Sequence, residues 1–80
     1  MPEIELSDEF KAKVRNDWDK GSAAVLEHAQ NEAWKLRVHG EDFDDQIKDA
    51  GELGILCGET RSLGTDGFFE RFETWVNRER

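Results

Sequence analysis

The chain has 80 residues and a formal net charge of −8, with 19 aspartate and glutamate residues against 11 lysine and arginine residues. This length fits one small domain, residues 1–80, and the negative charge disfavours direct binding to nucleic acid or to anionic membranes. A single cysteine excludes an internal disulfide, and the acidic residues 1–6 do not resemble a signal peptide, so a cytoplasmic protein is expected.

The first predicted helix covers residues 7–20. Phe10, Val14 and Trp18 recur at every fourth position, which places their side chains along one stripe of a helix. Ser7 is a residue type that commonly caps a helix, because its hydroxyl accepts a hydrogen bond from a free backbone N–H of the first turn. The helix is therefore expected to begin at Ser7 and to bury one apolar stripe.

The second predicted helix covers residues 22–39. Its apolar stripe falls within about 100° of arc, the width expected of a core-facing side, and consists of Val25, Leu26, Ala29, Ala33 and Leu36. Trp34 and Val38 lie roughly 80–120° away from this stripe. They either widen the buried side of the helix or form a second surface for contact with another chain.

The third predicted helix covers residues 42–51, and Asp42 is expected to cap it. Phe43, Ile47 and Ala50 share one face of this helix. That face is expected to point toward the core.

Two glycines leave the end of the third helix open. Gly51 and Gly54 each cost roughly 1 kcal/mol relative to alanine inside a helix, which favours an end at Gly51. Alternatively, the helix continues and the glycines let a neighbouring helix approach closely. A further alternative is an α+β fold, in which residues 53–57 and residues 3–6 form a short two-stranded element. Residues 58–67 are expected to be irregular, because three more glycines punctuate them.

The last predicted helix covers residues 66–79 and carries the densest group of aromatic residues in the chain. Its apolar positions follow helical spacing and are Phe68, Phe69, Phe72, Trp75 and Val76. Aromatic side chains bury a large area each, so this helix is expected to anchor the core. The predicted fold is all-α, a small array of four helices in a single domain.

The most unusual segment of the chain is acidic. Six carboxylates gather between residues 41 and 52 with only Lys48 among them, which gives the segment a charge of −5; they are Glu41, Asp42, Asp44, Asp45, Asp49 and Glu52. Asp45, Asp49 and Glu52 are spaced i, i+4, i+7 and would share one face of a helix. Such a row of carboxylates can imitate a phosphate backbone and attract a basic protein.

Calcium binding is the first alternative for the acidic segment. An EF-hand loop that begins at Asp42 would need glycine at its sixth position and glutamate at its twelfth, but the chain has Ile47 and Leu53 there. A looser divalent site would use Asp44, Asp45 and Asp49. The motif itself fails, and neither a metal nor a cofactor is predicted.

Catalysis is not expected from the only cysteine. Cys57 follows an apolar run, and apolar surroundings raise the pKa of a thiol, whereas a nucleophilic thiol needs a lowered pKa. His28 and His39 are the only imidazoles that could serve it as a base, and neither shows a catalytic spacing to it.

These features together favour a protein that binds another protein. Short, acidic, helical chains without catalytic motifs resemble, in type only, small bacterial or phage accessory proteins that inhibit or adapt larger machines. The working hypothesis is an inhibitor or adaptor that engages a basic, nucleic-acid-handling partner through the six carboxylates and Trp34, by nucleic-acid mimicry. The alternatives are a homo-oligomer, such as a homodimer joined through Trp34 and Val38, and a binder of small molecules or divalent metals.

Overall fold

The computed structural model describes residues 4–36, 38 and 42–79. The α-helices in this part of the chain are α1 (Asp8–Asp17), α2 (Ser22–Lys35), α3 (Phe43–Thr60) and α4 (Gly64–Glu79), and two short 3-10 helices, η1 (Trp18–Lys20) and η2 (Arg61–Leu63), follow α1 and α3. No strand occurs among the described residues, so the all-α prediction is confirmed and the α+β alternative is wrong.

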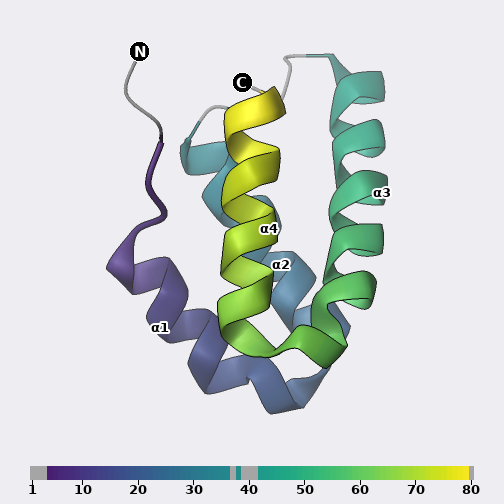
Figure 1. Cartoon of the computed structure of the whole chain (residues 1–80). Helices are drawn as coiled ribbons and strands as arrows, with labels where there is room; N and C mark the ends of the chain where they lie inside the picture. Colours follow the sequence, from purple (N-terminus) through teal and green to yellow (C-terminus); the bar gives the residue numbers. More distant parts are fainter. Residues whose placement is uncertain (1–3, 37, 39–41, 80) are drawn as a thin grey trace.

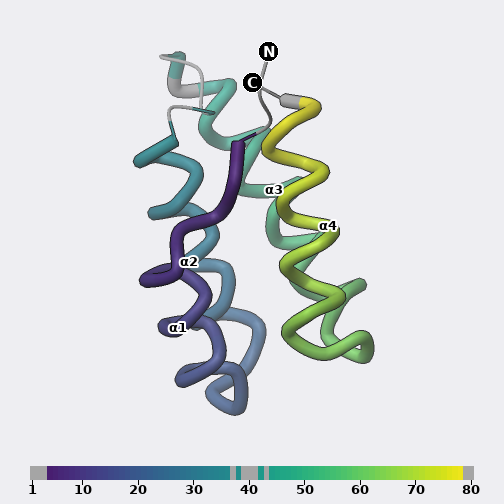
Figure 2. Tube along the Cα trace, turned by 60° about the vertical axis from the view of Figure 1, so that its left-hand side comes forward, coloured from purple at the N-terminus to yellow at the C-terminus, as the bar shows by residue number. Residues whose placement is uncertain are grey.

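The α-helices run alternately down and up and form a ring of neighbours (Figure 1). α1 packs against α2, α2 against α3, α3 against α4, and α4 returns to α1. In the rotated view, α1 and α2 form one side of the molecule and α3 and α4 the other (Figure 2). None of the helices in the described part is long and apolar enough to cross a membrane.

Aromatic rings fill the space between α1 and α4. Phe10 of α1 lies with its ring centroid 5.2 Å from that of Phe72 and 6.3 Å from that of Phe68. Trp75 stacks on Phe72 at 6.0 Å, nearly parallel to it. All four side chains are buried, which confirms α4 as the anchor of the core.

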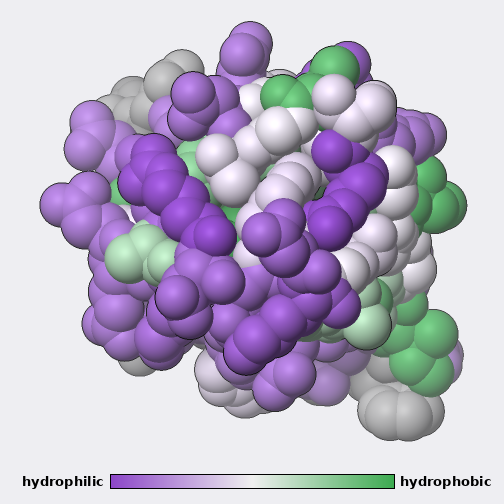
Figure 3. Space-filling model, turned by 90° about the horizontal axis from the view of Figure 1, so that it is seen from below, coloured by the Kyte–Doolittle hydropathy of each residue, from purple (hydrophilic) through white to green (hydrophobic). Residues whose placement is uncertain are grey.

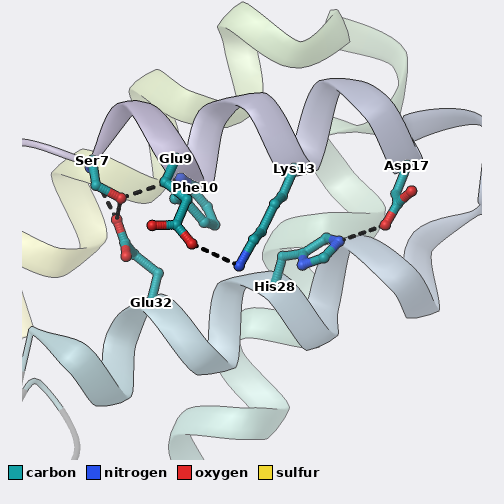
Figure 4. Close-up of polar contacts among 7 residues, drawn as sticks. All are labelled: Ser7, Glu9, Phe10, Lys13, Asp17, His28 and Glu32. Carbon is teal, nitrogen blue, oxygen red and sulfur yellow. Dashed lines mark hydrogen bonds and ion pairs between the residues drawn. The ribbon is translucent and has the colours of Figure 1, made fainter.

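The start of α1 is held by two side chains from different helices. Ser7 occupies the cap position, and its hydroxyl accepts a hydrogen bond from the backbone N–H of Phe10 at 3.2 Å. The carboxylate of Glu32, on α2, in turn accepts hydrogen bonds from the backbone N–H and the hydroxyl of Ser7, each at 3.0 Å (Figure 4). A glutamate that caps in this way usually comes from the third residue of the same helix, which here is Phe10.

α3 is longer than the predicted helix at residues 42–51. It continues through Gly51 and Gly54 to Thr60, because Leu53 and Cys57 lie on the side of the helix that faces the core and are fully buried. Burial of a leucine side chain contributes roughly 1.5–3 kcal/mol, which offsets the helix-weakening effect of the two glycines.

The predicted irregular segment at residues 58–67 is also helical. α3, η2 and α4 follow one another without a break, so the helical residues form three uninterrupted runs rather than four separate helices. The chain turns at Gly64, whose φ of +80° is a conformation that favours glycine. A Cβ on Gly67 would collide with the side chain of Leu63, so the tight turn also requires glycine there.

α2 ends four residues earlier than predicted. Its last residue is Lys35 rather than residue 39, and Leu36 forms the cap. Val38 follows with its backbone N–H donated to the carbonyl of Ala33 at 3.0 Å, and its side chain is buried. His39 lies outside the described residues.

Candidate protein-binding surface

The start of α3 presents exposed carboxylates. Asp42 precedes the helix in an extended conformation, and its carbonyl accepts a hydrogen bond from the backbone N–H of Gln46 at 3.1 Å. Asp44 and Asp45 occupy the first turn, where the positive end of the helix dipole stabilises negative charge. All three aspartates are exposed, and in the described part of the chain none of them enters an ion pair.

Two other predicted residues of the acidic segment serve the interior instead. Asp49 is only 8% exposed, because it lies one turn before the buried Leu53 and therefore faces the core. Glu52 is half-buried and accepts a hydrogen bond from the indole N–H of Trp75 at 3.2 Å. The row expected for Asp45, Asp49 and Glu52 is therefore not a solvent-facing row of charges.

Glu41, the remaining member of the acidic segment, lies outside the described residues. Within the acidic segment, the exposed carboxylates that the structure does place are thus confined to the first turn of α3 and the residue before it.

Trp34 projects from the last turn of α2 and is 63% exposed. It borders a shallow recess of about 220 Å³, together with Gln30 and Asn31 of α2 and Gln46 of α3. Because Gln46 directly follows Asp45, this recess adjoins the exposed aspartates. We call the surface made by Asp42, Asp44, Asp45 and Trp34, with the recess beside them, the acidic corner.

Three basic side chains of α1, η1 and α2 pair with acids outside the acidic corner. Lys13 pairs with Glu9 at 3.0 Å, and Lys20 pairs with Asp17 at 3.0 Å. His28 also contacts Asp17, at 2.7 Å (Figure 4). The hydrogen bond from His28, and then that from Lys20, lowers the pKa of Asp17 below its usual value.

Two arginines lie over aromatic rings rather than near α3's first turn. Arg61 lies 4.7 Å from the ring centroid of Trp18, and Arg15 lies 5.1 Å from that of Phe69. Arg15 also approaches Asp66 at 3.9 Å. These cations therefore do not neutralise the acidic corner.

The second surface predicted on α2 does not form as expected. Trp34 is exposed, but Val38 is buried in the core, so the two side chains do not present one seam to another chain. The homodimer predicted through this pair loses half of its contact.

On α3, a residue expected in the core is exposed instead. Ile47 was expected on the core-facing side, yet it is 55% exposed. Leu53, Cys57 and Asp49 define the buried side, and Ile47 lies roughly 80–160° away from these three residues on the helix. Ile55 is also exposed, at 64%. A polar Asp49 inside and an apolar Ile47 outside reverse the pattern on which the sequence-based assignment depended.

Of the residues considered for catalysis and metal binding, the structure describes Cys57, His28 and the three aspartates Asp44, Asp45 and Asp49. Cys57 is buried, and burial raises the pKa of its thiol to about 11, so the thiol stays protonated at neutral pH. Among the residues that the structure describes, no three His, Cys, Asp or Glu side chains are placed to hold a metal ion.

Gln30, Asn31 and Gln46 line the recess, although no pattern in the sequence singles them out. Glutamine and asparagine are ordinary surface residues, and only the packing of α2 on α3 brings them together. Comparison of the chain with protein-family models, with curated proteins and with solved structures found no match.

Proposed function

We propose that this protein acts without catalysis, as an inhibitor or adaptor that binds a basic partner protein through the acidic corner. The observation that carries this proposal is the exposure of Asp42, Asp44 and Asp45 beside an exposed tryptophan, with no ion pair to these aspartates in the part of the chain that the structure describes. Charge on one side of an interface steers a partner of opposite charge, and a central aromatic side chain supplies much of the binding energy.

A lysine or arginine from the partner fits both parts of the acidic corner. Its cationic group pairs with a carboxylate of Asp44 or Asp45, and it also stacks favourably on the face of an indole such as that of Trp34. The recess of about 220 Å³ beside Trp34 has room for one side chain of the partner. The net charge of −8 adds long-range attraction to the same class of partner.

Proteins that handle nucleic acid carry basic surfaces of this kind, and we propose them as the partner class. Occupation of such a surface by the acidic corner would exclude nucleic acid from it. Because Asp49 and Glu52 have roles inside the protein, this form of mimicry depends on the three exposed aspartates rather than on a row along α3.

The test measures capture of basic host proteins by the immobilised protein at about 0.1 M and about 1 M salt, where the electrostatic screening length falls from about 10 Å to about 3 Å. The double substitution Asp44→Asn/Asp45→Asn should weaken binding about tenfold at the lower salt concentration. Trp34→Ala should weaken it by a similar factor or more.

The matched control is Glu27→Gln/Glu70→Gln, which removes the same charge from two exposed positions outside the acidic corner. This control should bind like the unaltered protein. If both double variants lose the same affinity for the partner, net charge alone accounts for binding. Binding that does not respond to salt would contradict the electrostatic mechanism. If the protein displaces duplex DNA from a captured partner, that partner belongs to the class of proteins that handle nucleic acid.

A further inference from the structure

The recess of the acidic corner combines an aromatic ring with three carboxamide side chains. Gln30 and Asn31 lie one turn before Trp34 on α2, about 40° and about 60° to either side of it. Gln46 of α3 completes the described lining of the recess, whose volume is about 220 Å³. A partner side chain that enters the recess therefore meets an indole ring and neutral polar groups, with the carboxylates of the acidic corner in the neighbouring turn of α3.

Carboxamides and carboxylates attract different features of a cation. A carboxylate supplies negative charge and pairs with lysine and arginine alike. A carboxamide has no net charge, but its oxygen accepts hydrogen bonds from well-placed donors. Asp45 directly precedes Gln46, so the two kinds of group are adjacent in α3. A site that contains both can recognise the shape of a cation as well as its charge.

Arginine and lysine differ in how well they satisfy such a site. The guanidinium group is planar and weakly hydrated, and its N–H donors lie in its plane. Its face can therefore lie on an indole while its edge donates hydrogen bonds to surrounding oxygen atoms. The ammonium group of lysine is compact and strongly hydrated, so it gains from a carboxylate but gains less from a ring and neutral oxygens.

The cations of this protein divide in the same way. Arg61 lies 4.7 Å from the ring centroid of Trp18, and Arg15 lies 5.1 Å from that of Phe69. Among the residues that the structure describes, no lysine lies over an aromatic ring, whereas two lysines pair with carboxylates at 3.0 Å. The fold thus already places arginine, rather than lysine, on its aromatic rings.

The contact between Arg61 and Trp18 shows how little hydration a stacked guanidinium requires. The contact joins η1 to η2, at the end of the molecule seen in Figure 3, whose surface is mainly hydrophilic. Nη1 of Arg61 is nevertheless buried and has no hydrogen-bond partner in the described part of the chain. A weakly hydrated guanidinium tolerates this position better than an ammonium group would.

We propose that the recess selects arginine over lysine, so that the partner presents an arginine side chain to the acidic corner. The guanidinium lies on the indole of Trp34, and its edge donates hydrogen bonds to oxygens of the three carboxamides. Asp44 and Asp45 supply the charge, whereas the carboxamides and the indole determine which cation is preferred. This selection rests on the proposed function, since the same surface must first attract a basic partner.

Two synthetic peptides of equal charge test the selection by calorimetric titration of the full chain. Each peptide has four basic residues separated by glycine and serine, and one carries arginine where the other carries lysine. At about 0.05 M salt, where charges are weakly screened, both should bind. The arginine peptide should bind about tenfold more tightly, because stacking on Trp34 and a hydrogen bond to a carboxamide add to the ion pair.

Substitutions separate the selection from the attraction. Asn31→Leu should reduce the preference for arginine to about threefold or less and leave the affinity for the lysine peptide within about twofold. The same change at Asn16, an exposed asparagine of α1 outside the recess, is the matched control and should keep the tenfold preference. Asp44→Asn/Asp45→Asn should weaken both peptides by the same factor and so leave the preference in place.

Methylation of the peptide provides a second measurement that leaves the protein unaltered. A dimethylated guanidinium keeps its charge but loses part of its hydrogen-bonding edge. The arginine peptide with dimethylated side chains should therefore bind about threefold more weakly or worse than the unmodified peptide. Equal binding of the two forms would contradict recognition by the carboxamides.

The remaining outcomes distinguish this selection from the proposed function. Equal affinity for the arginine and lysine peptides, with both weakened by salt, would overturn the selection and leave the electrostatic binding intact. A preference that persists in both Asn31→Leu and Trp34→Ala would mean that the recess does not cause it. If neither peptide binds at low salt, the selection and the proposed function fail together.

Discussion

Glu32 shows how a single buried carboxylate can belong to another helix's cap. It is 3% exposed, on the same side of α2 as the buried Ala29 and Ala33, and it accepts two hydrogen bonds from Ser7. The cap at Ser7 was predictable from the sequence alone. Its partner was not, because the third residue of α1 is Phe10 and no local pattern points to position 32.

Replacing this carboxylate should be costly. Glu32→Ala leaves the donors of Ser7 without their buried acceptor and should lower the free energy of unfolding by about 2 kcal/mol. Ser7→Ala should lower it by about 1 kcal/mol through loss of the cap. Because both changes break the same cluster of hydrogen bonds, the double variant should lose less than the sum. Urea denaturation measures all three, with the exposed Glu27→Ala on the same helix as control. Strict additivity would contradict the coupling.

The positions of the exposed aspartates on α3 could be predicted from the sequence, whereas the burial of Asp49 could not. Charge density correctly indicated that Asp44 and Asp45 lie at the start of a helix, because dipole interactions favour acids there. The same charge density gave no warning that Asp49 turns inward. The available signal was the spacing of four residues between Asp49 and Leu53, which places both on one side of the helix. Counting the carboxylates of a segment ignores this spacing.

Along α3, the outcome depended on which of two weak signals was stronger. Glycines at 51 and 54 locally oppose a helix, whereas the apolar spacing of Leu53 and Cys57 supports one. Burial of Leu53 and Cys57 in the core stabilises the helix. A helix-propensity scale applied to a short window does not include this tertiary contribution. α1, α2 and α4 were predicted more closely because in them both kinds of signal agree.

The glycines of the chain should respond to alanine in opposite directions. Gly51→Ala should raise the free energy of unfolding by about 0.5–1 kcal/mol, since the position is helical and open. Gly64→Ala should lower it by about 1–2 kcal/mol, because its φ of +80° strains any residue with a Cβ. Thermal unfolding compares the two variants with the unaltered chain. A loss of stability in Gly51→Ala would mean that the monomer itself needs this glycine.

The whole molecule is closed by contacts between its two ends. The backbone N–H of Ile4 donates to the side-chain carbonyl of Asn77 at 2.8 Å, and the amide of Asn77 donates back to the carbonyl of Ile4 at 3.1 Å. Leu6, two residues later, is buried in the core. The segment before α1, which would be a strand in the alternative α+β fold, is thus held against α4 by these contacts.

Loss of this two-way bond should loosen the entire arrangement rather than one helix. Asn77→Ala should lower the free energy of unfolding by about 1–2 kcal/mol, because the backbone groups of Ile4 lose both partners. Thr74→Ala, on an exposed part of the same helix, is the control and should stay within about 0.5 kcal/mol of the unaltered chain. Hydrogen exchange at Ile4 and Leu6 should accelerate in Asn77→Ala alone; unchanged exchange would mean that burial of Leu6 suffices to hold the segment.

The pairing of Ile4 with Asn77 brings positions 73 residues apart in the sequence into contact. The two ends of the described chain therefore lie close together in space. A circular permutant that joins these ends by a short linker and opens the chain at Gly21 would preserve every neighbouring pair of helices while moving α1 from the first place to the last in the order of synthesis.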